Sequence, residues 1–170
     1  MKKRIGILLC SMCILMNVIS VNVQAAESGK ASIQSWDLVD SGKHLDWGGT
    51  SKYIKEFKSA VKKWNNYKSG VIRKDTIKTK QDVKIVDTKG RAEKKVLAET
   101  SKAGRAIYFY TSKMDSLSSE KCLHVCMHEL GHALGLAHNQ KNDVMSEISS
   151  WITKLSKNDK ASYDKAYKKY

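Results

Sequence analysis

The sequence contains no proline among its 170 residues, only two phenylalanines, and no internal repeat or long low-complexity tract. Its glycines and serines stand in short clusters, and none of these clusters reads as a linker between domains. With 41% hydrophobic residues, four Trp and seven Tyr, the chain has enough apolar material for one core and little for a second. These features exclude a multidomain protein and a disordered basic tail.

Acidic residues are scarce relative to basic ones. The 17 Asp and Glu residues stand against 31 Lys and Arg residues, which gives a net charge of +14. This excess favours electrostatic association with anionic partners such as cell-wall polymers or lipid headgroups, although lysine runs can equally form a solvated face. No recognisable nucleic-acid-binding module accompanies the charge, so we expect no specific nucleic-acid partner. A D-x-D-x-D-G loop is also missing, so no calcium site is predicted.

Only one long hydrophobic run occurs, at the start of the chain. Basic residues 2–4 precede an apolar run over residues 5–23, and Val-Gln-Ala at 23–25 fits a signal peptidase site. We predict a signal peptide over residues 1–25 and a secreted, extracellular catalytic domain over residues 26–170. The alternative is an uncleaved membrane anchor, because the run approaches the length of a bilayer span. Cleavage removes three cations, lowers the net charge from +14 to +11 and leaves no membrane span, and we expect a monomer.

Cysteine is nearly absent after residue 25, where only Cys122 and Cys126 remain. On a helix, residues four apart hold their Cβ atoms about 5 to 6 Å apart. A disulfide needs about 3.5 to 4.5 Å between these atoms. We therefore predict two free, buried thiols and a chain stabilised by its core rather than by disulfides.

Hydrophobic periodicity predicts an α+β domain in which one helix, several strands and two further helices follow in order. The first helix, residues 51–67, is amphipathic, with a lysine-rich outer face and Gly70 as its stop. Strands are predicted at residues 70–73, 83–86 and 105–110, with a weaker one at 96–100 and a candidate start of the sheet at 32–39. The second helix should run from Ser118 or Ser119 to Leu134, and a capping box of Ser156 and Asp159 should open the third.

Residues 128–138 contain the pattern H-E-x-x-H-x-x-G-x-x-H in full. His128 and His132 are one helical turn apart, so their imidazoles can converge on one zinc ion. Gly135 can adopt the left-handed conformation that ends the helix and turns the chain, which lets His138 supply a third nitrogen. Three protein ligands leave the fourth position open for water, as in catalytic zinc sites. We predict Zn²⁺ as the cofactor, bound by these three histidines.

Glu129 follows the first histidine and projects about 100° further round the helix, so it flanks the metal without binding it. A carboxylate there can act as general base toward a zinc-activated water. The sequence therefore predicts a zinc-dependent endopeptidase that hydrolyses peptide bonds of extended protein substrates, with Glu129 as its catalytic residue. Two alternatives stay open: a cationic extracellular protein that binds cell-wall polymer or another polyanion and carries a non-catalytic zinc site, and a hydrolase of a non-peptide amide.

Two further histidines lack such a pattern. His124 is two helical turns from His132, about 12 Å along the axis, and cannot join a metal sphere with both ligands. It is expected at the surface or beside the ligands. His44 has no partner pattern, so neither histidine is assigned a catalytic role.

With these residues in place, the chain resembles the metzincin zinc metalloproteases, and most closely the matrixins and their small secreted bacterial relatives. Met145 looks like the methionine of the turn beneath the metal, and L-S-x-x-D at residues 155–159 resembles the start of the last helix. The resemblance implies a twisted mixed sheet of about four or five strands. It also implies an N-terminal amphipathic helix, an active-site helix, a Met-turn and a C-terminal helix.

The resemblance also implies where a substrate lies. The strand before Ile107, with residues 96–100 as the candidate, would be the sheet edge to which the substrate adds as an antiparallel strand. Residues 147–151 would wall the pocket for the residue after the cleaved bond, although Trp151 can equally belong to the core. Three features depart from the family pattern: Asn139 replaces the usual serine, Glu147 stands where some relatives have a tyrosine ligand, and no cysteine lies between Ala26 and Lys121 to act as a latency switch.

Overall fold

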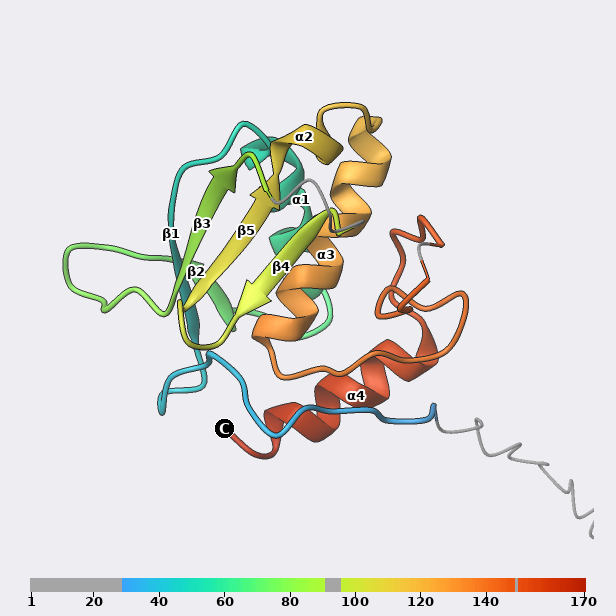
Figure 1. The fold of residues 1–170 in the computed structure, drawn as a ribbon. Helices are drawn as coiled ribbons and strands as arrows, with labels where there is room; N and C mark the ends of the chain where they lie inside the picture. The colour runs from blue at the N-terminus through green and yellow to red at the C-terminus, as the bar shows by residue number, and fades with distance from the viewer. Residues whose placement is uncertain (1–28, 91–95, 149) are drawn as a thin grey trace, which may run out of the picture.

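The computed structural model describes residues 29–90, 96–148 and 150–170. The predicted signal peptide, residues 1–25, lies outside the described residues. In these residues the elements follow in the order β1 (Leu45–Gly49), α1 (Ile54–Asn65), β2 (Ile72–Lys74), β3 (Val83–Thr88), β4 (Ala98–Ser101), β5 (Ala106–Tyr110), α2 (Thr111–Met114), α3 (Ser119–Ala133) and α4 (Lys157–Tyr167) (Figure 1). In this part of the chain, every helix falls short of the length and apolar character that a bilayer crossing needs.

The five strands form one mixed sheet in the order β2-β1-β3-β5-β4. β1 pairs in parallel with β2 and β3, and β3 pairs in parallel with β5. β4 runs antiparallel to β5 at the edge, with Thr100 opposite Ile107. The predicted α+β class and the size of the sheet are confirmed.

The core lies between the sheet and the two longest helices. Phe57 and Trp64 from the predicted apolar stripe of α1 are fully buried, and the Phe57 ring makes edge contacts with Trp47 and Phe109. The indole nitrogen of Trp64 donates to the carbonyl of Met127 at 3.0 Å, which ties α1 to α3. In Figure 1, α4 lies apart from the sheet, below α3, and the blue segment that starts at residue 29 runs along it.

The two thiols on α3 are free and buried, as predicted. Burial raises the pKa of Cys122 and raises that of Cys126 well above its usual value. Because the thiolate is the reactive form, both side chains act as small apolar groups in the core.

The prediction that residues 32–39 begin the sheet is wrong. This segment pairs instead with the end of α3 and the residues after it: the amide of Gln34 donates to the carbonyl of Gly135 at 2.8 Å, and that of Leu38 to the carbonyl of Ala133 at 2.9 Å. The strand that was not predicted is β1, because its two glycines and its aspartate are residues that strands usually lack. Asp46 is buried there because Arg73 pairs with both of its carboxylate oxygens, at 2.8 and 2.9 Å.

Candidate functional site

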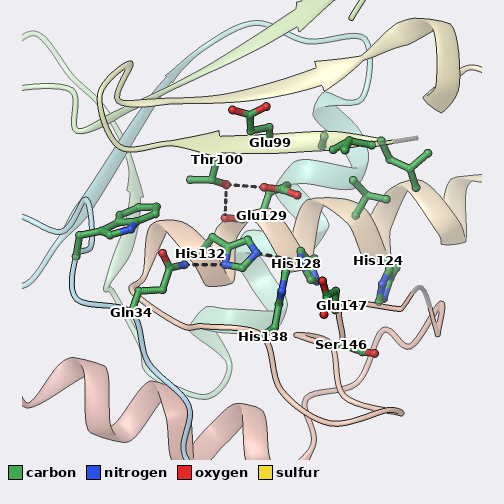
Figure 2. Close-up of a pocket in the computed structure, with 15 residues that line it drawn as sticks. Gln34, Glu99, Thr100, His124, His128, Glu129, His132, His138, Ser146 and Glu147 are labelled. Atoms are coloured by element: carbon green, nitrogen blue, oxygen red, sulfur yellow. Dashed lines mark hydrogen bonds between the residues drawn. The ribbon is translucent and has the colours of Figure 1, made fainter. Parts of the chain in front are cut away.

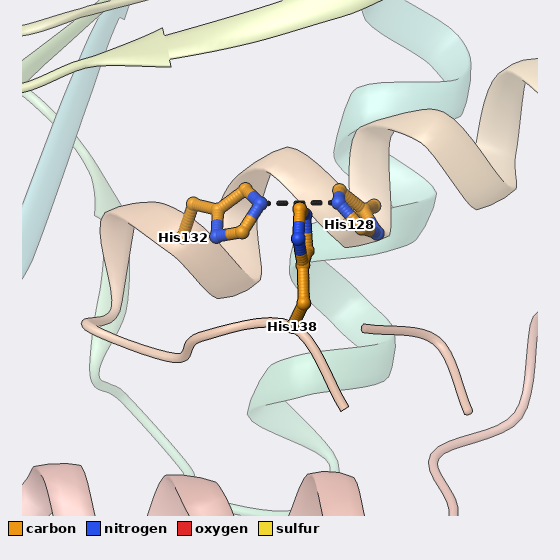
Figure 3. A group of neighbouring side chains, drawn as sticks. All are labelled: His128, His132 and His138. Carbon is orange, nitrogen blue, oxygen red and sulfur yellow. Dashed lines mark hydrogen bonds between the residues drawn. The ribbon is translucent and has the colours of Figure 1, made fainter. Parts of the chain in front are cut away.

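The structure brings the three motif histidines together (Figure 3). His128 and His132 project from one face of α3, and His138 approaches from the loop that follows it. Each ring offers a nitrogen, and these nitrogens lie within 4.8 Å of one another. The Nε2 atoms of His128 and His132 are 3.0 Å apart. These three side chains could hold one metal ion.

Hydrogen bonds on the far side of two rings determine which nitrogen faces the centre. Nδ1 of His128 lies 2.9 Å from the carbonyl of Val144, and Nδ1 of His132 lies 2.9 Å from the carbonyl of Leu136. The Val144 carbonyl only accepts, so Nδ1 of His128 carries the proton and its Nε2 presents a lone pair to the centre, toward which Nε2 of His132 also points. Lone pairs that converge at this distance suit a cation, and neutral imidazole is a common zinc ligand. The donor set therefore fits zinc.

Gly135 makes the turn that brings His138 to the centre. It adopts a φ of +82°, the left-handed conformation that glycine tolerates best. Its amide donates to the main-chain carbonyl of His132 at 2.9 Å, and the amide of Leu136 donates to the main-chain carbonyl of Gly131 at 2.9 Å. This pair of bonds is a Schellman motif, which ends the helix and reverses the chain beneath it.

Met145 lies under the active-site helix, as the resemblance implied. It is fully buried and packs against Gly131, the fourth residue of the H-E-L-G-H segment. A Cβ atom at position 131 would overlap the Met145 sulfur and crowd the Trp64 ring. Gly131 therefore allows Met145 to pack closely against the helix, a role that sequence reasoning missed because the pattern treats this position as free.

Asp159 fixes the Met-turn from below. The side chain is fully buried and accepts the amides of Val144 at 3.0 Å and Met145 at 3.1 Å. It also accepts the amide of Ser156 at 2.9 Å, which completes the predicted capping box of α4. One carboxylate thus joins the start of α4 to the loop whose Val144 carbonyl orients His128.

We expect Asp159→Ala to lower the free energy of unfolding by about 3 to 5 kcal/mol, because three buried amides lose their acceptor. Urea unfolding with a chelator present would measure this without a contribution from metal binding. Asp164→Ala is the matched control on the same helix. Its carboxylate is 44% exposed and pairs with Lys68, so the loss should be about 1 kcal/mol or less. Equal losses in the two variants would contradict the assigned role.

Glu129 lies next to the histidines, with only 6% of its surface exposed. Its carboxylate oxygen Oε2 accepts a hydrogen bond from the Thr100 hydroxyl on β4 at 2.6 Å (Figure 2). Burial raises the pKa of Glu129, while the neighbouring His132 and the Thr100 hydrogen bond oppose the rise. Sequence reasoning placed Glu129 beside the metal site but could not identify Thr100 as its partner.

Burial also controls the charge of the histidines. It lowers the pKa of His128 and that of His132 to about 4, although the carbonyls of Val144 and Leu136 oppose the shift. At neutral pH both rings are therefore uncharged, the form that binds metal.

These shifts predict an acid-labile metal-free protein. In the unfolded chain the two histidines bind protons near pH 6.5, whereas in the folded chain they bind them only near pH 4. The free energy of unfolding should therefore fall as the pH drops from about 6.5 to about 4. Urea midpoints across this range should decrease less in the variant with both His128→Asn and His132→Asn. The comparison with this variant is needed because the raised pKa of Glu129 increases the free energy of unfolding as the pH falls, which opposes the effect of the histidines. Identical slopes in the two proteins would refute the prediction.

A cleft of about 470 Å³ runs over the three histidines. One wall is the strand β4 with the residues just before it, and the other is formed by α3 and by Ser146 and Glu147 after the Met-turn. Gln34 and Trp36 of the N-terminal segment line one end. Within the described residues, β4 pairs only with β5, so its outer edge is free to pair with an extended chain.

His124 and Trp151 occupy places that sequence reasoning left open. His124 is only 3% exposed, so a surface position is ruled out. It lies beside His128, lines the cleft and bonds through Nδ1 to the carbonyl of Ile152 at 2.7 Å. Trp151 packs edge-on against His124 rather than lining the cleft. His44 lies away from the site, beside Asp40.

Gln34 is a second residue that the pattern could not reveal. Its amide nitrogen donates to the carbonyl of Leu136 at 2.7 Å and lies 2.8 Å from Nδ1 of His132. The Gln34 amide, Nδ1 of His132 and the Leu136 carbonyl thus form one cluster of mutual contacts. Nothing in the sequence near residue 34 indicates this contact, because it depends on where the N-terminal segment packs.

Comparison with known proteins agrees with this geometry. The family model for the matrixins, peptidase family M10, matches residues 35–168, a span that includes the sheet, the histidines and α4. No curated protein matches the chain. Because the family model covers most of the sequence, the chain belongs to the matrixin family of zinc-dependent metallopeptidases, with the metzincin-like α+β fold of that family.

Proposed function

We propose that the chain is a secreted zinc endopeptidase that cuts extended protein substrates, with His128, His132 and His138 as its metal ligands and Glu129 as its general base. One observation carries the proposal. Three imidazole nitrogens within 4.8 Å of one another lie in an open cleft directly beside a buried carboxylate. The protein supplies three donors to a metal that binds four groups, and this arrangement is typical of catalytic rather than structural zinc.

Zinc bound at this centre would supply a Lewis acid that polarises the scissile carbonyl and acidifies water. Glu129 takes a proton from the attacking water and delivers it to the leaving nitrogen. Its raised pKa suits both steps, since a carboxylate of increased basicity holds the proton until the C–N bond breaks.

The free edge of β4 would align the substrate. A peptide in extended form can pair with this edge as a further antiparallel strand, which directs its backbone across the histidines. Main-chain pairing is independent of side chains, so selectivity would come from the pocket beside His124, Ser146 and Glu147.

Secretion is part of the proposal and rests on the signal-like residues 1–25. After cleavage the protein keeps a net charge of +11, which favours salt-dependent association with anionic cell-wall polymers. N-terminal sequencing of protein recovered from the culture medium should start at Ala26. A start at Met1 in a membrane fraction would support an uncleaved anchor instead.

The activity is tested by metal analysis together with mapping of cleavage sites in a peptide library by mass spectrometry. We expect one zinc per chain and cleavage within peptides rather than at their ends. Zinc binding with no cleavage, combined with retention on a cell-wall polyanion, would overturn the proposal in favour of the binding protein. Cleavage of a small non-peptide amide, with no cleavage of peptides, would indicate a hydrolase of non-peptide amides instead.

A further inference from the structure

The Thr100 hydroxyl is the feature of the cleft that neither the motif nor the family match assigns. Its Oγ1 atom lies 2.6 Å from Oε2 of Glu129 and 2.9 Å from the main-chain carbonyl of the same residue. Among the described residues, no other side chain donates a hydrogen bond to this carboxylate. Figure 2 shows both contacts converging on the Thr100 hydroxyl.

The strand fixes the direction of this hydroxyl. Side chains alternate along β4, so Ala98 and Thr100 share one face while Glu99 points to the opposite side. Thr100 pairs with Ile107 of β5, which is fully buried and holds the strand in register. Threonine is β-branched and therefore stiff at χ1, so the hydroxyl has little freedom to turn away.

The carboxylate, by contrast, has several rotatable bonds. Glu129 reaches the cleft from a rigid helix, but its own three χ angles would let the two oxygens take up several directions. A hydroxyl proton directed at Oε2 restricts these directions and leaves Oε1 as the oxygen that can accept a proton from water. A misplacement of about 1 Å at a reacting group can cost about 100-fold in rate.

We propose that Thr100 is a positioning residue, whose hydroxyl holds the Glu129 carboxylate in the orientation that proton transfer requires. The inference rests on the proposed role of Glu129 as general base. It assigns a second contribution to β4, which then both borders the substrate and orients the base.

The kinetic test uses isosteric variants. Thr100→Val removes the hydroxyl and keeps the shape, and it should lower kcat about 10-fold or more with KM within about twofold. Thr100→Ser keeps a hydroxyl and should retain kcat within about threefold. Thr111→Val is the matched control, because the Thr111 hydroxyl donates to the Thr88 carbonyl at 3.3 Å, and both kinetic constants should stay near those of the wild type. Unfolding midpoints and zinc content show that each variant is folded and loaded.

A second measurement does not depend on peptidase activity. The Thr100 hydroxyl proton should exchange slowly with water in the NMR spectrum of the zinc-loaded protein. Glu129→Ala removes the carboxylate but keeps the main-chain carbonyl. We expect this variant to lose the slow exchange, because the proton is directed at Oε2.

Three results would overturn the inference: a Thr100→Val variant with unchanged kcat, a hydroxyl proton that exchanges rapidly in the wild type, or slow exchange that survives Glu129→Ala. The last result would mean that the hydroxyl donates to the helix carbonyl and serves only packing. A wild-type protein that cuts no peptide would refute the proposed function instead, and the proton measurement would still decide which atom accepts the hydrogen bond.

Discussion

Glu129→Ala should lower kcat/KM on a peptide substrate by 100-fold or more, since general acid–base catalysis contributes roughly 10²- to 10⁴-fold. Zinc content should be unchanged, because the three histidines that form the centre do not include this residue. The free energy of unfolding should stay constant or rise, because the variant no longer buries a carboxylate whose pKa is raised by desolvation. Loss of activity with retained stability would identify a residue that acts in the reaction.

Glu147→Ala is the matched control for this experiment. Glu147 lines the same cleft but is exposed and makes no hydrogen bond to the histidines. Its removal can alter KM through the substrate pocket, but kcat should change by a few-fold at most. Glu129→Ala activity within a few-fold of wild type would refute the role of Glu129, and with it the mechanism.

Removal of zinc with 1,10-phenanthroline should abolish peptide cleavage while the fold persists. The core consists of fully buried side chains on α1, α3, α4 and the sheet, so its packing does not depend on the metal. The thermal midpoint should fall by about 5 to 10 °C, because zinc present at about 100 times its Kd contributes about 2.7 kcal/mol.

The non-chelating isomer 1,7-phenanthroline serves as the control, and added zinc should restore both cleavage and the midpoint. Cleavage that continues in protein shown to be metal-free would contradict the assignment. Complete unfolding on chelation would indicate a structural zinc site. It would favour the alternative of a cationic protein that binds a polyanion and does not cut peptides.

The arrangement of the motif histidines could be predicted from the sequence because helical geometry alone relates His128 to His132. The position of His138 followed from one further fact, the left-handed conformation of Gly135, which the structure shows at a φ of +82°. Helix starts at Ser118 and Ser156 were predictable for a similar reason, since a cap depends on residues only three apart.

The errors and omissions involve contacts between distant parts of the chain. β1 escaped prediction because Asp46 is buried only after Arg73 arrives from β2. Thr100 and Gln34 contact Glu129 and His132 from segments 29 and 98 residues away in the sequence. Local periodicity carries no information about such pairs, so only the assembled fold reveals them.

The bond between Asp159 and the Met-turn also determines when the centre can form during synthesis. A nascent chain whose three histidines have left the ribosome still lacks α4, and therefore lacks the carboxylate that holds the loop beneath His128. The centre can be completed only after residues 157–167 have emerged and folded onto the earlier segments. In this order of assembly the histidines emerge first and gain their support only when α4 docks.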